Sequence, residues 1–154
     1  MWKKEFGKSI FTILSTQYLL NDTLIEEVYK IKKKIYPDNF YDNIKVLDFA
    51  KKFYQIPNSK NVICTTTTYD VVNKVLKNKN INNYFYAIYD RANVKEQKPR
   101  PNIYIYAARQ FINPEKINIF EDSDVGIQAA EAFKQINLNT TIYKIEGDNG
   151  YSVE

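Results

Sequence analysis

Short apolar runs alternate with helical patterns along the chain from residue 44 onwards. The runs have the length of strands, and the segments between them repeat apolar residues at helical spacing. We expect strands at 61–65, 84–89, 117–120 and 141–145, and helices at 44–54, 69–76, 102–111 and 124–133. This alternation predicts an α/β protein whose parallel sheet is covered by helices on both faces. Such a sheet binds ligands at the carboxyl ends of its strands.

The amino-terminal segment Trp2–Tyr36 has a different, purely helical pattern. It predicts a helical hairpin that breaks at Asn21-Asp22. Residues Ser9–Thr16 also have β propensity and could form a strand, although the longer helical period favours helix. Pro37-Asp38-Asn39 predicts a closing turn, and the tail at 146–150 is expected to be loose.

The composition excludes several classes of protein. We expect the 154 residues to form one domain, or one domain with a small appendage. They include no histidine, so Ser-His-Asp triads and ordinary zinc sites cannot be built from them. The single cysteine, Cys64, lies in an apolar run and is expected to be a small buried side chain. The net charge of +4 comes from dispersed lysines, which argues against a nucleic-acid surface. Because no apolar stretch approaches the about 20 residues of a membrane span, we expect a cytoplasmic protein without a membrane partner.

Polar side chains occur where the first of the predicted strands ends and before the third predicted helix. Thr65 and Thr66 open a run of threonines, and a hydroxyl followed by backbone N–H groups can hold a phosphate oxygen. Threonine is also an ordinary residue at strand ends and helix caps. Lys98 precedes Pro99 and Pro101, which predict an extended, rigid backbone ahead of the helix. In so lysine-rich a chain, a lysine is more often solvent-facing.

A pair of carboxylates, Glu121 and Asp122, follows the third predicted strand. One interpretation is a turn with Ser123 as helix N-cap, where acids favour the helix dipole. The other is a magnesium site, because Mg²⁺ takes oxygen ligands and is usually held by one or two carboxylates together with substrate phosphate. If the sheet is parallel, these acids meet Thr65 and Lys98 at one edge, and the set suits phosphoryl transfer.

These segments, in this order, resemble the motifs of the haloacid dehalogenase (HAD)-like superfamily. Val62–Thr65 resembles its second motif, Lys98–Pro101 its third, and Phe120–Ser123 with Gly126 its fourth. Asn102 stands where the family usually has an aspartate, at an expected helix N-cap. The resemblance covers about residues 42–145 and is to the β-phosphoglucomutase-like and phosphoglycolate-phosphatase-like branch.

The resemblance implies a fold, a division of the chain and a chemistry. Residues 42–154 would form a Rossmann-like core containing strands 2 to 5, and residues 1–41 a partial helical cap, or simply an amphipathic hairpin. The implied activity is that of a magnesium-dependent phosphatase or phosphomutase acting on a small phosphorylated metabolite such as a sugar phosphate. Thr65, Thr66 and Lys98 would hold the phosphate, with Thr65 and Lys98 as catalytic residues. Mg²⁺ would bind Asp122, with Glu121 close by.

The family's first motif, Asp-x-Asp-x-Thr, has no counterpart before Thr65. Aligning Ile10–Leu14 with it puts Thr12 and Leu14 at the aspartate positions, and neither can form an aspartyl phosphate. We therefore expect a truncated chain that begins inside the cap and lacks the first central strand. The strands on either side would then pair directly or receive a strand from another chain, because unpaired buried backbone groups are costly.

Three hypotheses follow for the function. The first is a truncated phosphatase or phosphomutase that is inactive alone because the nucleophilic aspartate is missing. The second is a subunit completed by another chain that carries the missing strand. The third is a non-catalytic module that binds phosphate through Thr65 and Lys98.

Overall fold

The computed structural model describes residues 21–35, 40–147 and 150–153. The chain divides into two compact units, Met1–Asn43 and Ile44–Glu154, and this division falls two residues after the expected one. In the first unit, α2 (Asp22–Ile35) confirms the second helix of the predicted hairpin, and its Leu24 N–H donates to Asn21 Oδ1 at 3.0 Å. The first predicted helix and the turn at 37–39 lie outside the described residues. The cap assignment therefore stays a prediction.

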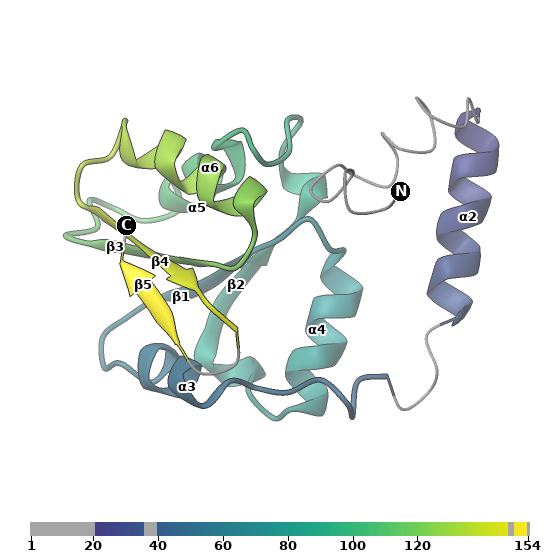
Figure 1. Ribbon diagram of the computed structural model, residues 1–154, viewed down its shortest axis with the longest axis horizontal. Helices are drawn as coiled ribbons and strands as arrows, with labels where there is room; N and C mark the ends of the chain where they lie inside the picture. Colours follow the sequence, from purple (N-terminus) through teal and green to yellow (C-terminus); the bar gives the residue numbers. More distant parts are fainter. Residues whose placement is uncertain (1–20, 36–39, 148–149, 154) are drawn as a thin grey trace. The chain divides into compact units, whose positions relative to one another are not determined.

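The second unit is built on parallel strands (Figure 1). Strand β1 (Asn61–Cys64) pairs in parallel with β2 (Phe85–Tyr89), and β3 (Ile117–Glu121) pairs in parallel with β4 (Thr140–Ile145). All four strands lie within one residue of their predicted bounds, so the parallel α/β fold is confirmed. Within the part of the chain that the structure describes, however, they form two separate sheets, β1-β2 and β3-β4-β5. The strands on either side of the expected gap, β1 and β3, have not closed up to pair directly.

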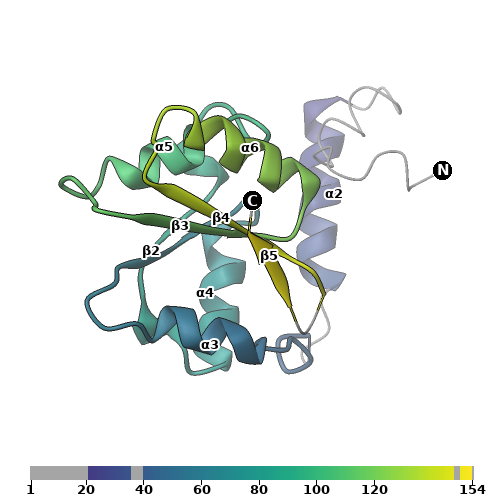
Figure 2. The same cartoon turned by 60° about the vertical axis from the view of Figure 1, so that its left-hand side comes forward.

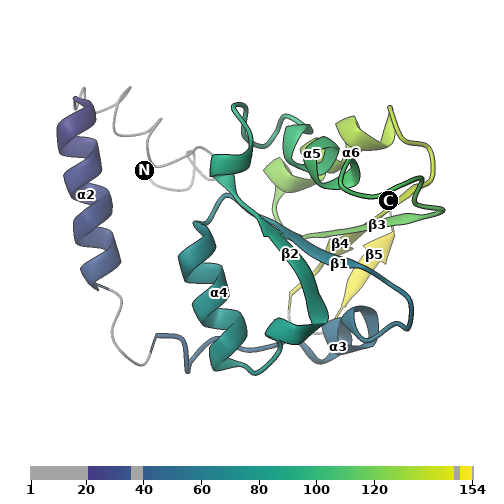
Figure 3. The same ribbon diagram turned by 180° about the vertical axis from the view of Figure 1, so that it is seen from behind.

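Helices cover these sheets on two sides, as predicted (Figures 2 and 3). On one side lie α5 (Asn102–Ala108) and α6 (Asp124–Lys134), and on the other α3 (Asp48–Tyr54) and α4 (Tyr69–Asn78). Helix α3 begins four residues later than expected, because Leu47 has an extended backbone and Asp48 opens the first turn beside Lys51. None of the described helices combines the length and the apolar character that crossing a bilayer requires.

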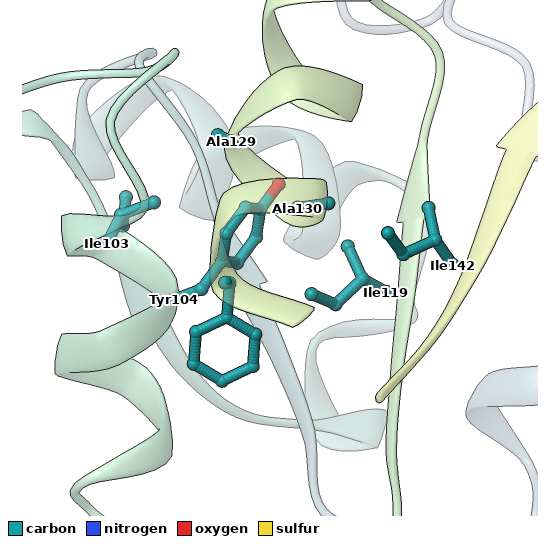
Figure 4. Packing of buried hydrophobic residues seen from close by; sticks show 7 residues of the cluster. Ile103, Tyr104, Ile119, Ala129, Ala130 and Ile142 are labelled. Carbon is teal, nitrogen blue, oxygen red and sulfur yellow. The ribbon is translucent and has the colours of Figure 1, made fainter. Parts of the chain in front are cut away.

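One hydrophobic cluster holds α5 and α6 against the β3-β4-β5 sheet (Figure 4). Its members come from both helices and from β3 and β4: Ile103, Tyr104, Ile119, Ala129, Ala130, Phe133 and Ile142. The two alanines of α6 are fully buried, and their small size lets the helix approach the strands closely. The core therefore lies directly behind the carboxyl end of β3.

An aromatic cluster occupies the opposite face of the same sheet. Phe120 of β3 stacks on Tyr143 of β4 with ring centroids 4.6 Å apart, and Phe53 of α3 lies 4.5 Å from Phe120. Tyr151 joins them from β5 (Tyr151–Val153), which pairs antiparallel with β4. Within the segment 146–150, which was expected to be loose, the Glu146 N–H donates to the Gly150 carbonyl, so the two described ends of this segment are hydrogen-bonded to each other.

Asp90 ties the end of β2 to the start of α4, a role that the sequence did not reveal. Its carboxylate accepts from the Tyr69 N–H at 2.7 Å and from the Ala92 N–H at 2.9 Å. Its own N–H donates to Asn93 Oδ1 at 2.8 Å, which starts the 3-10 helix η3 (Arg91–Asn93). The residue is only 8% exposed, so these bonds replace its hydration.

We predict that Asp90→Ala lowers the free energy of unfolding by about 2 to 3 kcal/mol, because it leaves buried N–H groups without an acceptor. Asp70→Ala is the matched control, since Asp70 is an exposed residue in the first turn of α4 and should cost less than about 1 kcal/mol. Urea denaturation followed by circular dichroism measures both. Equal losses in the two variants would contradict the bracing role of Asp90.

Candidate functional site

Lys98 and Glu121 form a buried ion pair where β1 and β3 end. The Lys98 ammonium donates to Glu121 Oε1 and, at 3.1 Å, to the carbonyl oxygen of Cys64. Both side chains are only 9% exposed. The interpretation of Lys98 as a solvent-facing residue is therefore wrong, and the expected convergence of Lys98 with the Glu121 carboxylate is observed. A single ammonium connects the carboxyl ends of strands from the two sheets.

Tyr104 completes this network, and sequence reasoning missed it. Its hydroxyl donates to the same Glu121 oxygen, and its ring centroid lies 5.0 Å from Lys98 Nζ. Burial first, and the neighbouring Glu121 charge second, raise the pKa of the Tyr104 hydroxyl above its ordinary value. A tyrosine inside a buried helix pattern could have indicated this contact, because a buried hydroxyl needs a partner.

Gly126 gives the Glu121 carboxylate the space that it occupies. A Cβ at position 126 would overlap the Glu121 carboxylate and lie 2.9 Å from Ser123 Oγ. Ser123 Oγ accepts from the Gly126 N–H at 3.1 Å and caps α6, as predicted. Glycine is therefore required at position 126, because the Glu121 carboxylate lies so close to its Cα. Lys98 and Tyr104 bind this carboxylate and keep it from moving aside.

Thr65 lies beside the ion pair, since the peptide that joins Cys64 to Thr65 carries the carbonyl bound by Lys98. The Thr65 N–H donates to the Tyr89 carbonyl at 2.9 Å, and Thr65 Oγ1 accepts from the Thr67 N–H at 3.0 Å. The expectation of free N–H groups after Thr65 is thus wrong at Thr67, and also at Tyr69, which donates to Asp90. Thr66 is exposed. No group of the described residues accepts a hydrogen bond from the Thr65 hydroxyl, so its proton is available for donation there.

Asp122 is exposed immediately after β3, unlike its neighbour Glu121. In residues 21–35, 40–147 and 150–153, no three His, Cys, Asp or Glu side chains gather as a metal cluster. A Mg²⁺ ion needs only one or two carboxylates when water and phosphate supply the rest, so a single exposed Asp122 fits such an ion. Glu121 instead directs Oε1 to Lys98 and Tyr104.

The segment around the two prolines differs from the prediction. Instead of an extended backbone, Gln97–Arg100 forms a turn in which the Arg100 N–H donates to the Gln97 carbonyl at 3.0 Å, and the Lys98-Pro99 bond is cis. Pro101, not Asn102, is the N-cap of α5. Asn102 is the first helical residue, and its amide donates to Glu96 at 3.2 Å. Fixed proline φ angles suit turns as well as extended chains, so the sequence alone did not separate the two.

Cys64 is partly buried between β1 and α5, in agreement with its apolar sequence context. Its Sγ lies 4.0 Å from the Ile103 carbonyl, and its side chain packs against the core cluster. Burial raises the pKa of the Cys64 thiol to about 12, while the Lys98 charge opposes this rise. The thiol is therefore protonated at neutral pH and is not a nucleophile.

Comparison with known proteins places this arrangement in a family. Residues 5–140 match the family described as Haloacid dehalogenase-like hydrolase. The chain is 28% identical over 108 residues to a phosphorylated carbohydrates phosphatase of Thermotoga maritima, covering 70% of this chain and 50% of that protein. This chain therefore spans about half the length of that relative. Because the match to the family takes in most of the sequence, the chain belongs to the haloacid dehalogenase-like hydrolases.

Solved structures share the fold at low sequence identity. A HAD-superfamily hydrolase from Geobacter sulfurreducens has a TM-score of 0.60 and 20% identity, covering 73% of this chain and 59% of that one. A candidate β-phosphoglucomutase from Thermotoga maritima has a TM-score of 0.54 and 24% identity, covering 83% of this chain and 60% of that one. These likenesses confirm the expected Rossmann-like α/β fold.

We predict that Gly126→Ala lowers the free energy of unfolding by about 1 to 3 kcal/mol, because the new methyl group displaces the Glu121 carboxylate from Lys98. The higher helix propensity of alanine, about 1 kcal/mol, works in the opposite direction. Gly150→Ala is the control, since a Cβ there meets no atom within 4 Å. If urea denaturation finds Gly126→Ala as stable as the parent chain, the carboxylate is not fixed in place.

We predict that the folded chain reacts with a thiol reagent at pH 8 at least about a hundredfold more slowly than the urea-unfolded chain, because the raised pKa suppresses the Cys64 thiolate. The protonated thiol is favoured in the folded state. Its contribution to stability is therefore complete below 9.0, the ordinary pKa of a cysteine thiol, and is lost as the pH rises toward about 12. Equal rates in the two states would show that Cys64 is solvent-accessible.

Proposed function

We propose that the chain carries the phosphate-binding and magnesium-binding part of a phosphatase or phosphomutase acting on a small phosphorylated metabolite. The observation that supports this most is the buried Lys98 ammonium, held between Glu121 and the carbonyl next to Thr65. A cation fixed at the carboxyl edge of parallel strands is suited to a phosphate group, because no reorganisation is needed when charge develops on its oxygens.

Each residue has a separate task in this proposal. Lys98 neutralises the phosphate oxygens, and Thr65 donates its hydroxyl proton to one of them. Glu121 and Tyr104 keep the ammonium in place. Asp122 is the ligand of Mg²⁺, which when bound supplies positive charge next to the phosphate. Glu121 then acts close by rather than as a direct ligand, and Thr66 contacts the phosphate from the exposed side.

The substrate class is proposed by analogy with a relative. The Thermotoga maritima protein is named as a phosphatase of phosphorylated carbohydrates, and we propose a sugar phosphate here as well. Which sugar phosphate is the substrate depends on the rest of the enzyme, including the cap that we assign to residues 1–41. We place the protein in the cytoplasm, where such metabolites occur.

The attacking aspartate is not among these residues, since no Asp-x-Asp precedes Thr65. We therefore propose that the 154-residue chain by itself binds phosphate esters but does not hydrolyse them. A module that binds phosphate without any catalytic partner would use the same Thr65 and Lys98. The two possibilities differ in whether supplying the missing aspartates restores turnover.

We predict that the chain binds glucose 6-phosphate in calorimetry and that this binding falls at least tenfold in Lys98→Met/Glu121→Gln. Removing both charges together avoids leaving an unpaired buried carboxylate that could unfold the protein. Glu121→Gln is the matched variant, because it keeps the ammonium and frees it from its partner, so binding should be retained or tighter. Lys95→Ala, at an exposed residue, should change nothing.

Two results would overturn parts of this proposal. Equal binding by Glu121→Gln and by the double variant would show that Lys98 does not contact phosphate. Magnesium-dependent hydrolysis of p-nitrophenyl phosphate by the chain alone, lost in Asp122→Asn, would show that a nucleophile is present after all. If the chain alone shows no hydrolysis, Asp122→Asn should reduce the effect of magnesium on glucose 6-phosphate binding. Binding measured without magnesium should be unchanged.

A further inference from the structure

Four connections lead from a helix into a parallel strand, and they lie at the amino ends of the strands, away from the candidate phosphate site. Figures 1 and 3 show them at the tails of the strand arrows. The helix-to-strand connections of a parallel α/β unit share one edge, because the strands all run away from it. We call these connections the amino-end surface: residues 55–60, 79–84, 109–116 and 135–139.

Contacts join these connections to one another. Three of the contacts link two connections, either directly or through the strand that follows: Gln55 Nε2 to the Tyr84 hydroxyl at 3.4 Å, Phe111 to Tyr86 with ring centroids 5.5 Å apart, and the Ile117 N–H to the Asn139 carbonyl at 3.0 Å. In addition, Lys60 Nζ lies 5.3 Å from the centroid of the Tyr86 ring. The four connections therefore form one continuous surface.

Large aliphatic side chains project from the amino-end surface into solvent. Ile112 is 96% exposed, Leu138 86% and Ile136 66%. Local backbone structure fixes the connections that carry them: Asn113 has a left-handed φ of 43°, and the Ile136 N–H donates to the Phe133 carbonyl at 3.0 Å. A single exposed aliphatic side chain is ordinary in a folded protein, but a group of them on joined connections indicates an interaction surface.

The same connections are basic. They contain one acid, Glu115, and four cations: Lys60, Lys79, Arg109 and Lys116. Their net charge of +3 compares with +4 for all 154 residues. Lys60, Arg109 and Lys116 are exposed. The surface thus combines projecting aliphatic side chains with positive charge, the two properties through which proteins bind the interface of an anionic membrane.

We propose that the amino-end surface docks on an anionic lipid bilayer. The aliphatic side chains enter the boundary between head groups and acyl chains, and the cations meet the lipid phosphates. The expectation of no membrane partner rests on the lack of a spanning segment, and a peripheral contact needs none. Docking in this way leaves Lys98 and Thr65, at the other edge, turned away from the bilayer. It does not depend on the proposed function.

Charge and shape favour a bilayer over other occupants of this surface. A second copy of the chain would bring positive charge against positive charge. A nucleic acid would neutralise the cations, but it offers no apolar phase for Ile112 and Leu138. A protein partner would need a matching pocket for each projecting side chain, whereas fluid lipid adapts to them.

The test is sedimentation of the chain with vesicles of equal parts phosphatidylglycerol and phosphatidylcholine, and with vesicles of phosphatidylcholine alone. We expect binding to the anionic vesicles to be at least about tenfold stronger, and to be lost in high salt, which screens the cations. Ile112→Ser/Leu138→Ser should weaken binding at least about tenfold. The matched control is Leu24→Ser/Ile31→Ser, at two exposed apolar residues of α2, which should change binding little.

A second pair of variants tests the cations. Lys60→Gln/Lys116→Gln should weaken vesicle binding at least about tenfold. Lys74→Gln/Lys95→Gln removes two exposed lysines outside the surface and should weaken binding less. Because both variants remove the same charge, a difference between them locates the contact at the amino-end surface.

Four outcomes would overturn the inference: equal binding to the two kinds of vesicle, undiminished binding by Ile112→Ser/Leu138→Ser, equal losses in a variant and its control, or self-association that the two serines abolish. Binding that survives the loss of the aliphatic side chains would be a purely electrostatic contact, such as a nucleic acid makes. Glucose 6-phosphate and Lys98→Met/Glu121→Gln should leave vesicle binding unchanged, since they act at the other edge. If vesicles bind and glucose 6-phosphate does not, this inference stands and the proposed function fails. The opposite pair of results reverses both conclusions.

Discussion

The buried contact between Lys98 and Glu121 connects the two halves of the α/β unit. Glu121 ends β3, and the carbonyl that shares the ammonium ends β1, so one side chain spans two sheets that are not hydrogen-bonded to each other in the described residues. Desolvating two charges gains little net stability, but removing one partner would leave the other uncompensated. Tyr104 and Gly126 support this pair. The Tyr104 hydroxyl donates to Glu121, and Gly126 has no Cβ to overlap the Glu121 carboxylate.

Two observations stand side by side at this edge: β1 and β3 belong to separate sheets in the described residues, and the sequence has no Asp-x-Asp before Thr65. In the haloacid dehalogenase-like pattern that the sequence resembles, the central strand carries the attacking aspartate, and that motif does not precede Thr65. In residues 21–35, 40–147 and 150–153, β1 pairs only with β2, and β3 pairs only with β4. The residues of β1 are half-buried, and Asn118 and Phe120 of β3 are exposed.

Local patterns predicted most of the fold but only part of the site. The four parallel strands and helices α4 and α6 follow from short apolar runs and helical periodicity, which are properties of neighbouring residues. Strand β5 was missed because its stability comes from pairing with β4 and from the ring of Tyr151 against Tyr143. Asp90 was missed for a similar reason, since its hydrogen-bond partner Tyr69 lies 21 residues away.

The sequence by itself determined the family and the positions of the four parallel strands along the chain, because both depend on residue types at short spacings. It also placed Thr65, Lys98 and Glu121 at one edge, since parallel strands have their carboxyl ends together. Only the tertiary structure decided that Glu121 is the buried partner of Lys98 while its neighbour Asp122 faces solvent. Successive side chains near a strand end point in opposite directions, and which of them is buried depends on what packs there. Here that packing comes from α5 and α6, through Tyr104 and Gly126.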